Sequence, residues 1–482
     1  MNRTERKFLQ NNTSSWGLRP LSPWGQDGCR PFTSPISTNS IKPTGHATAP
    51  VPTVYPMNIL QRLSILALLC LLACQSKAQS FNSYFNPQTL RLDYIFAGDR
   101  DTQHIFLDEM MIMDKWYGRT HHLDSLPLEG NGQITVADSL TGRIIYRQSF
   151  STLFQEWLST EESRHTRKSF ENVFLIPMPQ RSVCITVQLF DFRRNVTASM
   201  SHTVNPNDIL IRRHQPERTL PYCTLHQAAD TTRCINIAFV AEGYTAEEME
   251  LYKEDAAKAT AALFEHEPFR SMQSLFHVIA ILSPSAQSGT SIPSKGKWTS
   301  TVLDSHFDTF YSTRYLTTSH LKKLHNLLAG TPYEHIIVLV NTNEYGGGGI
   351  YNSYNLSYTH GPHFLPVVVH EFGHSFGGLA DEYDYTNDDP MYFSDTEPWE
   401  QNITTLKDFS GKWQNLIDEK KASLIEGGGY QRKGVWRGCD NCRMRTNEVK
   451  EFCPVCQQAL QRLIHFYTEK PSKSCTGVIE KM

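Results

Sequence analysis

The sequence lacks several of the short motifs that mark large enzyme classes. It contains no phosphate-binding loop of the G-x-x-x-x-G-K-[ST] type and no dinucleotide-binding G-x-G-x-x-G fingerprint. An excess of charge of one sign is also missing, because 46 basic residues stand against 49 acidic ones and no basic stripe is present. We therefore expect neither a nucleotide-driven enzyme nor a protein that binds nucleic acid.

The chain also lacks an apolar run long enough to cross a membrane comfortably. Its apolar stretch from Leu63 to Leu72 follows Met57 and Arg62 and precedes small and polar residues, which is the anatomy of a secretory signal. We expect residues 57–79 to be this signal. A signal normally stands at the true start of a chain, so residues 1–56 are expected to be an artefactual or disordered extension.

The end of this signal allows two ways of processing. The letters LLAC, which end at Cys74, resemble a bacterial lipobox, in which the cysteine becomes a lipid-anchored N-terminus. The alternative is ordinary cleavage nearer Gln79. Either way we expect an exported protein that is secreted, periplasmic or lipid-anchored at the bacterial cell surface, with no other membrane contact. Export also makes disulfides permissible among the 11 cysteines.

What is present points to a folded chain of two domains. The 482 residues include 25 Phe, 20 Tyr and 8 Trp, which is ample material for a packed core. Residues 80–213 contain alternating segments such as TLRLDYIFAG, QITVADS and SVCITVQLFDF, which predict an antiparallel β-sandwich, interrupted by a helical insertion near 153–163. This region either positions a substrate or only supports its neighbour.

The second predicted domain spans residues 234–482 and follows a polar linker at 214–233. Buried-type strands such as CINIAFVAEGY and HIIVLVNT alternate with helical segments, one of them capped by Thr245 with Glu248 three residues later. This alternation predicts an α/β layer with mixed strand directions. The fold class expected is therefore α+β/α/β, with a β-sandwich followed by an α/β domain.

The most informative stretch is VVVHEFGHSFGGLADEY, in which His370, Glu371 and His374 form an H-E-x-x-H motif. On a helix, side chains four residues apart lie on one face, so both imidazoles can reach one Zn²⁺ ion. Glu371 is then placed to hold an attacking water. After the two glycines that end the helix, Asp381 and Glu382 are the candidates for a third ligand.

Two further patterns accompany this motif. Four glycines at 346–349 predict a close backbone approach, with an exposed edge strand that could pair with an extended peptide. The C-x₂-C-x₁₀-C-x₂-C spacing fits either a second zinc site or, in an exported protein, disulfides. The cysteines concerned are Cys439, Cys442, Cys453 and Cys456.

The chain resembles the IgA peptidase family of secreted zinc metalloendopeptidases. The resemblance rests on AFVAEGYT, VLVNTNEYGGGGIYNSY, VVVHEFGHSFGGLADEY, CRM and FCPVC, and it extends to the strand-rich region before them. More broadly the site is similar to that of metzincins, whose third ligand would fall at Ala380. Because alanine cannot bind a metal, the resemblance favours Asp381, with Glu382 as the rival, and it makes Met444 the candidate Met-turn beneath the ion.

The resemblance implies a zinc-dependent endopeptidase with Glu371 as general base and a protein or peptide as substrate. Immunoglobulin A and mucin-type glycoproteins are the candidate substrates. The alternative is a cell-surface module that binds glycoproteins and carries a non-catalytic metal site, which the departure at Ala380 favours. The intact Glu371 speaks against this alternative, because a purely structural zinc site needs no free carboxylate there.

Overall fold

The computed structural model describes residues 81–385 and 390–469. The predictions for residues 1–56, for the signal at 57–79 and for Cys74 therefore lie outside the described residues. Across the described ranges, no helix has the length and apolar character that a membrane crossing requires.

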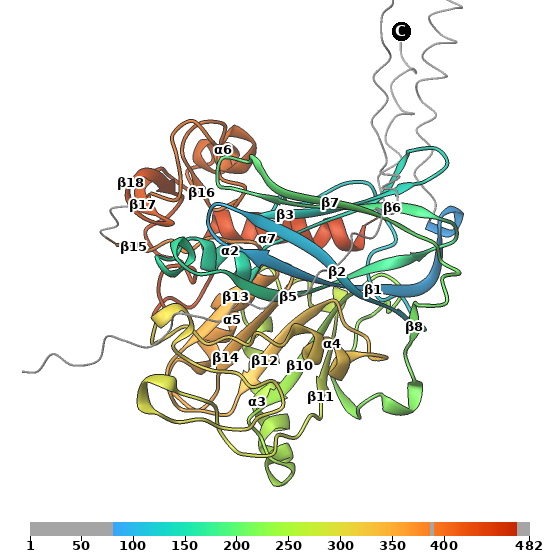
Figure 1. Cartoon of the computed structure of the whole chain (residues 1–482). Coiled ribbons are helices and arrows are strands. Elements are labelled where there is room, and N and C mark those ends of the chain that lie inside the picture. The colour runs from blue at the N-terminus through green and yellow to red at the C-terminus, as the bar shows by residue number, and fades with distance from the viewer. Residues whose placement is uncertain (1–80, 386–389, 470–482) are drawn as a thin grey trace, which may run out of the picture. The chain divides into compact units, whose positions relative to one another are not determined.

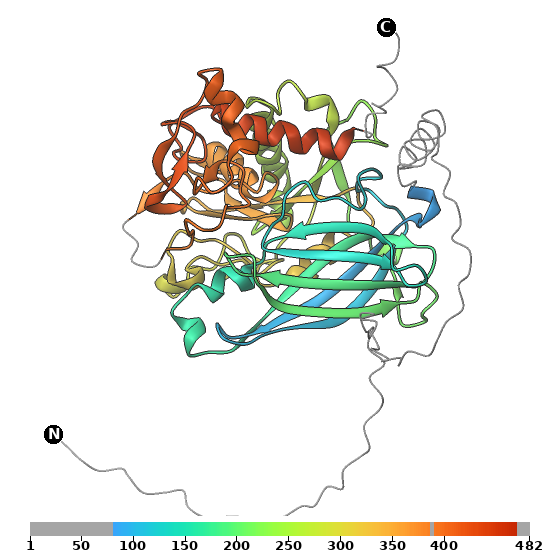
Figure 2. The same cartoon turned by 90° about the horizontal axis from the view of Figure 1, so that it is seen from above.

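The first part of the chain forms two four-stranded sheets, with strand orders β5-β1-β2-β8 and β4-β3-β6-β7 (Figures 1 and 2). Neighbouring strands are antiparallel apart from β2 and β8. The strands are β1 (Phe85–Gly98), β2 (Gln103–Met113), β3 (Gly132–Asp138), β4 (Ile144–Phe150), β5 (Lys168–Pro179), β6 (Val183–Phe190), β7 (Val196–Val204) and β8 (Arg212–Arg213). Alternate residues of both sheets share one core, as side chains on a half-buried strand must.

Two of these strands were not expected from the sequence. In β2 and β7, several of the residues on the outer face are exposed and polar or short, so little apolar alternation is visible. The helical insertion is present as α2 (Leu153–Leu158), capped by the Thr152 side chain, which accepts a hydrogen bond from the Gln155 amide.

The second part is built on a six-stranded mixed sheet of order β13-β14-β12-β10-β11-β9 (Figure 1). Its four inner strands are parallel to one another, and the two edge strands are antiparallel to their neighbours. The strands are β9 (Tyr222–His226), β10 (Ile235–Glu242), β11 (Phe276–Ile281), β12 (His335–Val340), β13 (Gly347–Ile350) and β14 (Tyr354–Tyr358). β9 lies inside the span 214–233 that the sequence led us to expect as a linker.

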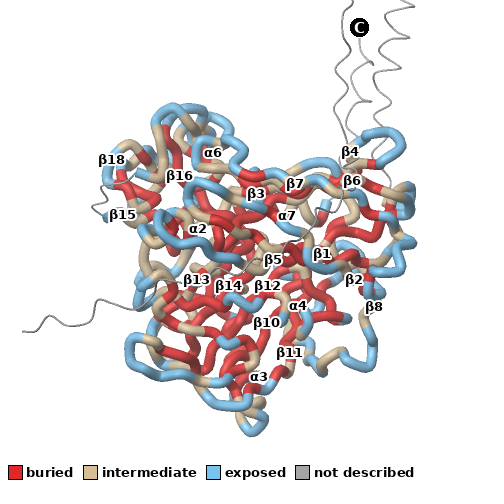
Figure 3. Tube along the Cα trace, in the orientation of Figure 1, coloured by how far each residue is buried: buried red, intermediate tan, exposed pale blue. Residues whose placement is uncertain are grey.

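This sheet is buried on both faces, which explains why its strands read as continuous apolar runs (Figure 3). On β10, Ile237 and Phe239 face the core made with α3 (Met249–Phe264), α5 (Phe364–Ser375) and α7 (Pro454–Thr468). Ala238 and Val240 face the opposite core, which includes α4 (Leu321–Leu328). The expected capping by Thr245 and Glu248 is present on the 3-10 helix η4 (Ala246–Glu248), which leads directly into α3, since the Glu248 carboxylate accepts from the Thr245 amide at 2.8 Å.

The first part of the chain packs directly on the α4 side of this sheet. Leu153 and Val173 join the same core as α4, and the buried Arg91 donates to the Asn326 side chain at 2.6 Å while pairing with Asp93. The described residues all belong to one compact unit, Ile59–Met482. The molecule is thus mixed α/β with several sheets, and its division into two domains remains a prediction.

The C-terminal part adds a small sheet and two helices beside α5. Its elements are β15 (Asp384–Tyr385), β16 (Ile403–Thr404), α6 (Ser410–Asp418), β17 (Ile425–Gly428), β18 (Tyr430–Arg437) and α7. Strand β18 pairs with β15, β16 and β17 and so ties the segment after the H-E-x-x-H helix to the end of the chain.

Candidate active site

The helix that carries the H-E-x-x-H motif is α5, and it ends where the glycines predict. Val367, Val368 and Val369 are buried and anchor its first half in the core. Gly378 has a φ of +57°, a left-handed conformation that glycine adopts without strain. The chain reverses there, and the Leu379 amide donates to the Gly373 carbonyl at 3.1 Å. The reversal returns the following residues to the face that carries the two histidines.

His370 and His374 are held in the same orientation by backbone carbonyls. His370 Nδ1 lies 3.0 Å from the Arg443 carbonyl, and His374 Nδ1 lies 2.6 Å from the Leu379 carbonyl. Because a carbonyl can only accept, each Nδ1 carries a proton, so in the neutral ring Nε2 is the nitrogen with a free lone pair. Metal-binding histidines typically donate their other nitrogen to such a partner.

Asp381 lies beside the two imidazoles, and each of the three residues offers one possible ligand atom. We name this group the histidine cluster (His370, His374 and Asp381). The two Nε2 atoms are 3.1 Å apart, and Asp381 Oδ1 lies 3.1 Å from that of His370 and 3.3 Å from that of His374. Ligands bound at about 2.0–2.1 Å to one tetrahedral ion stand about 3.3 Å apart, so these separations fit a single metal. Asp381 Oδ1 is buried and faces both Nε2 atoms.

The charges of this cluster are mutually dependent. Burial opposes ionisation of Asp381, yet the charge and hydrogen bonds of the two histidines hold its pKa well below the usual range. Burial likewise disfavours the charged imidazole of His374, but the Asp381 carboxylate raises its pKa to about 9. The cluster thus combines a carboxylate and two imidazoles whose charges depend on one another, the type of donor set that could hold a metal ion.

Glu371 points toward the cleft between α5 and β13, and burial raises its pKa above the usual value for a carboxyl. The glycines of β13 make this approach possible. A Cβ on Gly347 would lie 2.6 Å from Glu371 Oε1, and a Cβ on Gly349 would lie 2.5 Å from the Glu371 carbonyl and 3.0 Å from His374 Cβ. The prediction of a close backbone approach beside the motif agrees with this geometry.

The expectation of a fully exposed glycine-rich edge is wrong in part. β13 is indeed the last strand of its sheet, but the Gly347 amide donates to the Arg314 carbonyl and its carbonyl accepts from the Leu316 amide. Residues 314–316 therefore cover this end of the strand. Gly349, two residues along, presents its backbone on the same side and lines the cleft.

The cleft has a volume of about 1870 Å³ and is lined from both parts of the chain. From the first part, Glu156 on α2 enters its wall and accepts a hydrogen bond from the Tyr315 hydroxyl. Burial raises the pKa of Glu156 to about 7, and the nearby His374 charge acts in the opposite direction. No local sequence pattern indicates Glu156, because only the packing of α2 against the second part of the chain brings it to the cleft.

Tyr430 is a second site residue that sequence reasoning missed. Its hydroxyl donates to Asp381 Oδ2, which leaves Oδ1 directed at the histidines. It sits at the tip of the β17–β18 hairpin, where Gly429 donates its amide to the Asp381 carbonyl at 2.8 Å. Tyr430 has a φ of +66°, and the glycine run 427–429 before it forms the turn. That run signals a tight turn but not its position beside Asp381.

Met444, the candidate Met-turn, packs against the motif helix. It is fully buried, and a Cβ on Gly373 would come within 2.5 Å of its sulfur, so Met444 packs against α5 between the two histidines. Its carbonyl accepts from the Glu382 amide at 2.9 Å. Its assignment as the Met-turn of a metzincin remains a prediction.

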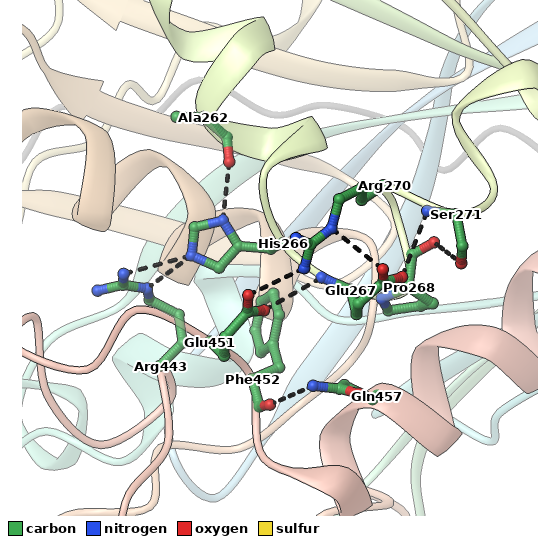
Figure 4. A network of polar contacts seen from close by, with 10 residues as sticks. All are labelled: Ala262, His266, Glu267, Pro268, Arg270, Ser271, Arg443, Glu451, Phe452 and Gln457. Atoms are coloured by element: carbon green, nitrogen blue, oxygen red, sulfur yellow. Dashed lines mark hydrogen bonds and ion pairs between the residues drawn. The ribbon is translucent and has the colours of Figure 1, made fainter.

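Arg443, whose carbonyl holds His370, is itself fixed by a polar network (Figure 4). Its guanidinium donates to His266 Nε2 at 3.3 Å, while His266 Nδ1 donates to the Ala262 carbonyl at 2.7 Å. Burial lowers the pKa of His266, which keeps the ring neutral and able to accept from the arginine. The Arg443 amide also donates to the Glu451 carbonyl at 3.0 Å. The orientation of His370 thus rests on a chain of contacts reaching α3.

The remaining residues near the motif have structural partners. Residues 373–377 also match the G-x-S-x-G pattern, but Ser375 is buried in α5 and accepts from the Asn355 side chain at 2.7 Å. The Ala380 amide donates to Asn402 Oδ1 at 2.8 Å. Glu382, the rival third ligand, turns away from the histidines and lies among cysteines.

Comparison with known families agrees with this geometry. Residues 223–425 match the IgA Peptidase M64 family model, and residues 80–201 match the model of the Peptidase M64 N-terminus. Tyr430 and Met444 lie beyond the matched residues. No curated protein matched the chain. The histidine cluster lies inside the residues matched by the peptidase model. The chain therefore belongs to the IgA peptidase M64 family, whose members are hydrolases of the metallopeptidase type.

Proposed function

We propose that this protein is a zinc-dependent endopeptidase in which His370, His374 and Asp381 hold the ion. The observation that carries the proposal is the convergence of their three ligand atoms to within 3.3 Å of one another. Two imidazoles and a carboxylate suit zinc, and three protein ligands leave one coordination position open, as in catalytic sites.

When bound, a zinc ion supplies a Lewis acid that polarises the scissile carbonyl and acidifies water. The protein supplies the proton transfers. Glu371 stands on the same helix turn as the two histidines and faces the cleft. Its carboxylate is therefore placed to take the proton of the attacking water and to pass it to the leaving amine.

The substrate is an extended segment of protein that lies along the cleft beside β13. Support comes from the backbone of Gly349, which faces the cleft where an extended chain can add main-chain hydrogen bonds. Immunoglobulin A is the first candidate because it gives the family its name, and mucin-type glycoproteins are the second. The protein acts after export, in a secreted, periplasmic or lipid-anchored form, with Cys74 as the candidate anchor.

The test compares Glu371→Gln with the wild type for zinc content and for cleavage of unfolded and native proteins. Glu371→Gln keeps the zinc and loses cleavage by about 10²–10⁴-fold, because only the proton carrier is removed. Glu250→Gln is the matched control, since this exposed glutamate on α3 pairs only with Lys253, and it retains full activity. A zinc-loaded Glu371→Gln that cleaves as fast as the wild type would contradict the assigned role. A wild type that holds zinc but cleaves nothing would favour the binding-module alternative.

A further inference from the structure

A second group of possible ligands lies directly behind the histidine cluster. Glu382, Cys442, Cys453 and Cys456 are all buried, and their ligand atoms all lie within 4.8 Å of one another. We name this group the cysteine cluster. Its cysteines lie beyond the residues that match the family model, which ends at 425. Neither the histidine cluster nor the proposed cleavage reaction uses any of these side chains.

The sulfur separation suits a shared ion better than a covalent bond. Cys442 Sγ and Cys456 Sγ are 3.6 Å apart, well beyond the S–S bond length of about 2.05 Å. Thiolates bound at about 2.3 Å to one tetrahedral ion stand about 3.8 Å apart. The observed distance is therefore close to the edge of such a tetrahedron.

The Glu382 carboxylate supplies an independent observation. It is completely buried, with Oε1 placed 3.0 Å from Cys456 Sγ and accepting from Asn402 Nδ2 at 3.0 Å. Its second oxygen, Oε2, is also buried and has no hydrogen-bond partner in the described parts of the chain. A pair of neutral disulfides beside this carboxylate would bring no positive charge to it, whereas a divalent ion compensates its charge.

The surroundings of Cys442 are those of a thiolate. The backbone amides of Met444 and Cys453 point at Cys442 Sγ from 3.5 and 3.3 Å. Such N–H donors stabilise negative sulfur and commonly support metal-bound cysteines. The nearby guanidinium of Arg437, itself buried, attracts the Glu382 carboxylate and offsets part of the negative charge.

We propose that Cys442, Cys453, Cys456 and Glu382 bind a second zinc ion in a closed, structural site. Three soft sulfurs and one carboxylate oxygen are a donor set that selects zinc over magnesium or calcium. Cys439 completes the sequence spacing and touches Cys453, but its thiol is partly exposed and lies outside the group of close ligand atoms. It is not one of the four ligands.

An ion in the cysteine cluster would help to hold the histidine cluster in place. Glu382 directly follows Asp381, and its amide donates to the Met444 carbonyl at 2.9 Å. Cys442 directly precedes Arg443, whose carbonyl orients His370. A closed site therefore ties together two of the segments that place ligands in the histidine cluster. The second ion stays bound whether or not the first site cleaves peptide bonds.

The direct test isolates the second ion by removing the first. The full mature chain carrying His370→Ala and His374→Ala is purified without chelator, and zinc is measured by elemental analysis and X-ray absorption. We expect about one zinc per chain with a sulfur shell at about 2.3 Å, against about two per chain in the wild type. Absence of zinc, or a shell of nitrogen and oxygen alone, would overturn the proposal.

A matched pair of serine variants tests the ligand set. Cys456→Ser lowers the zinc content of the wild type from about two ions to about one, while Cys439→Ser keeps both. If Cys439→Ser loses an ion, the proposed ligand set is wrong.

If Cys456→Ser fails to fold, the wild type itself answers the question. It is denatured with chelator but no reductant, alkylated and analysed by mass spectrometry. Alkylation of Cys442, Cys453 and Cys456 supports the site, whereas peptides joined by a disulfide between any of them overturn it.

Discussion

The histidine cluster and the cysteine cluster are neighbours that differ in nearly every property. One offers two imidazoles and a carboxylate at the wall of a wide cleft; the other offers three thiols and a carboxylate with no access to solvent. Asp381 belongs to the first and Glu382 to the second, so one peptide unit joins them. Catalytic metal sites keep a position open and structural ones are closed. The two proposed sites therefore differ in access to solvent as well as in ligand type.

We expect the largest difference between the two clusters when Asp381 is removed. Asp381→Ala takes away the third ligand of the histidine cluster, so the open site loses its ion and cleavage falls on the order of 10³-fold or more. The ion of the cysteine cluster stays, because Glu382 keeps its side chain. Zinc content and cleavage rate are the two measurements. Asp384→Ala is the control, since that carboxylate pairs with Arg432 at the surface and its loss leaves both quantities unchanged.

We expect a chelator to remove the ions of the two clusters at different rates. Chelator reaches the open histidine cluster directly, but the buried cysteine cluster releases its ion only when the surrounding structure opens. We expect two phases of zinc release, with activity lost in the first and the second slower by about 10-fold or more. A zinc-sensitive dye followed alongside activity makes the measurement. A single phase carrying two ions would show that the clusters exchange together.

A substitution at Gly349 tests whether the edge strand β13 affects only the histidine cluster. A methyl group there would press on the Glu371 carbonyl and His374 Cβ, and displacements near 1 Å in an active site cost about 10²-fold in rate. Gly349→Ala should therefore reduce kcat/KM by about 10–100-fold with the sulfur-bound ion retained. Gly411→Ala is the control, because a Cβ at that position meets no atom within 4 Å.

The smallest expected effect concerns Glu334, a buried carboxyl that belongs to neither cluster. Its titration changes the stability of the whole chain with pH, so it must be separated from any pH effect on the two clusters. Burial raises the pKa of Glu334 to about 8, so the folded chain keeps this proton while the unfolded chain loses it near pH 4.5. Stability therefore falls as pH rises between these values. Glu334→Gln keeps an oxygen for the Asn236 amide and removes the fall. Its Tm should gain on the wild type by about a few degrees between pH 5 and 8; a constant difference would contradict this.

The sequence predicts the ligands of the histidine cluster better than it predicts the residues that surround them. His370, Glu371 and His374 follow from helical spacing, and Asp381 follows from the turn that the glycines impose. The choice between Asp381 and Glu382 needs the fold, because adjacent side chains point to opposite sides and only packing decides which side holds the histidines. Glu156 and Tyr430 belong to segments far from the motif in the sequence, and no local pattern predicts that they lie at the site.

The fold shows the same limit. The inner strands of the second sheet are predictable because both faces are buried and their apolar runs are continuous. β2 and β7 escape prediction because their outer faces are polar and their alternation is weak. The covering of Gly347 by residues 314–316 is likewise invisible in the sequence, since it joins segments more than thirty residues apart.

The shared peptide unit of Asp381 and Glu382 limits how this segment can vary in length. One residue inserted or deleted between Gly378 and Asp381 would move the aspartate out of reach of the histidines and move the glutamate away from the cysteines. Both clusters would fail together, although each could tolerate conservative changes of its own ligands. We therefore expect the interval between the second histidine and the acidic pair to keep its length, while the nearby surface loops are free to lengthen or shorten.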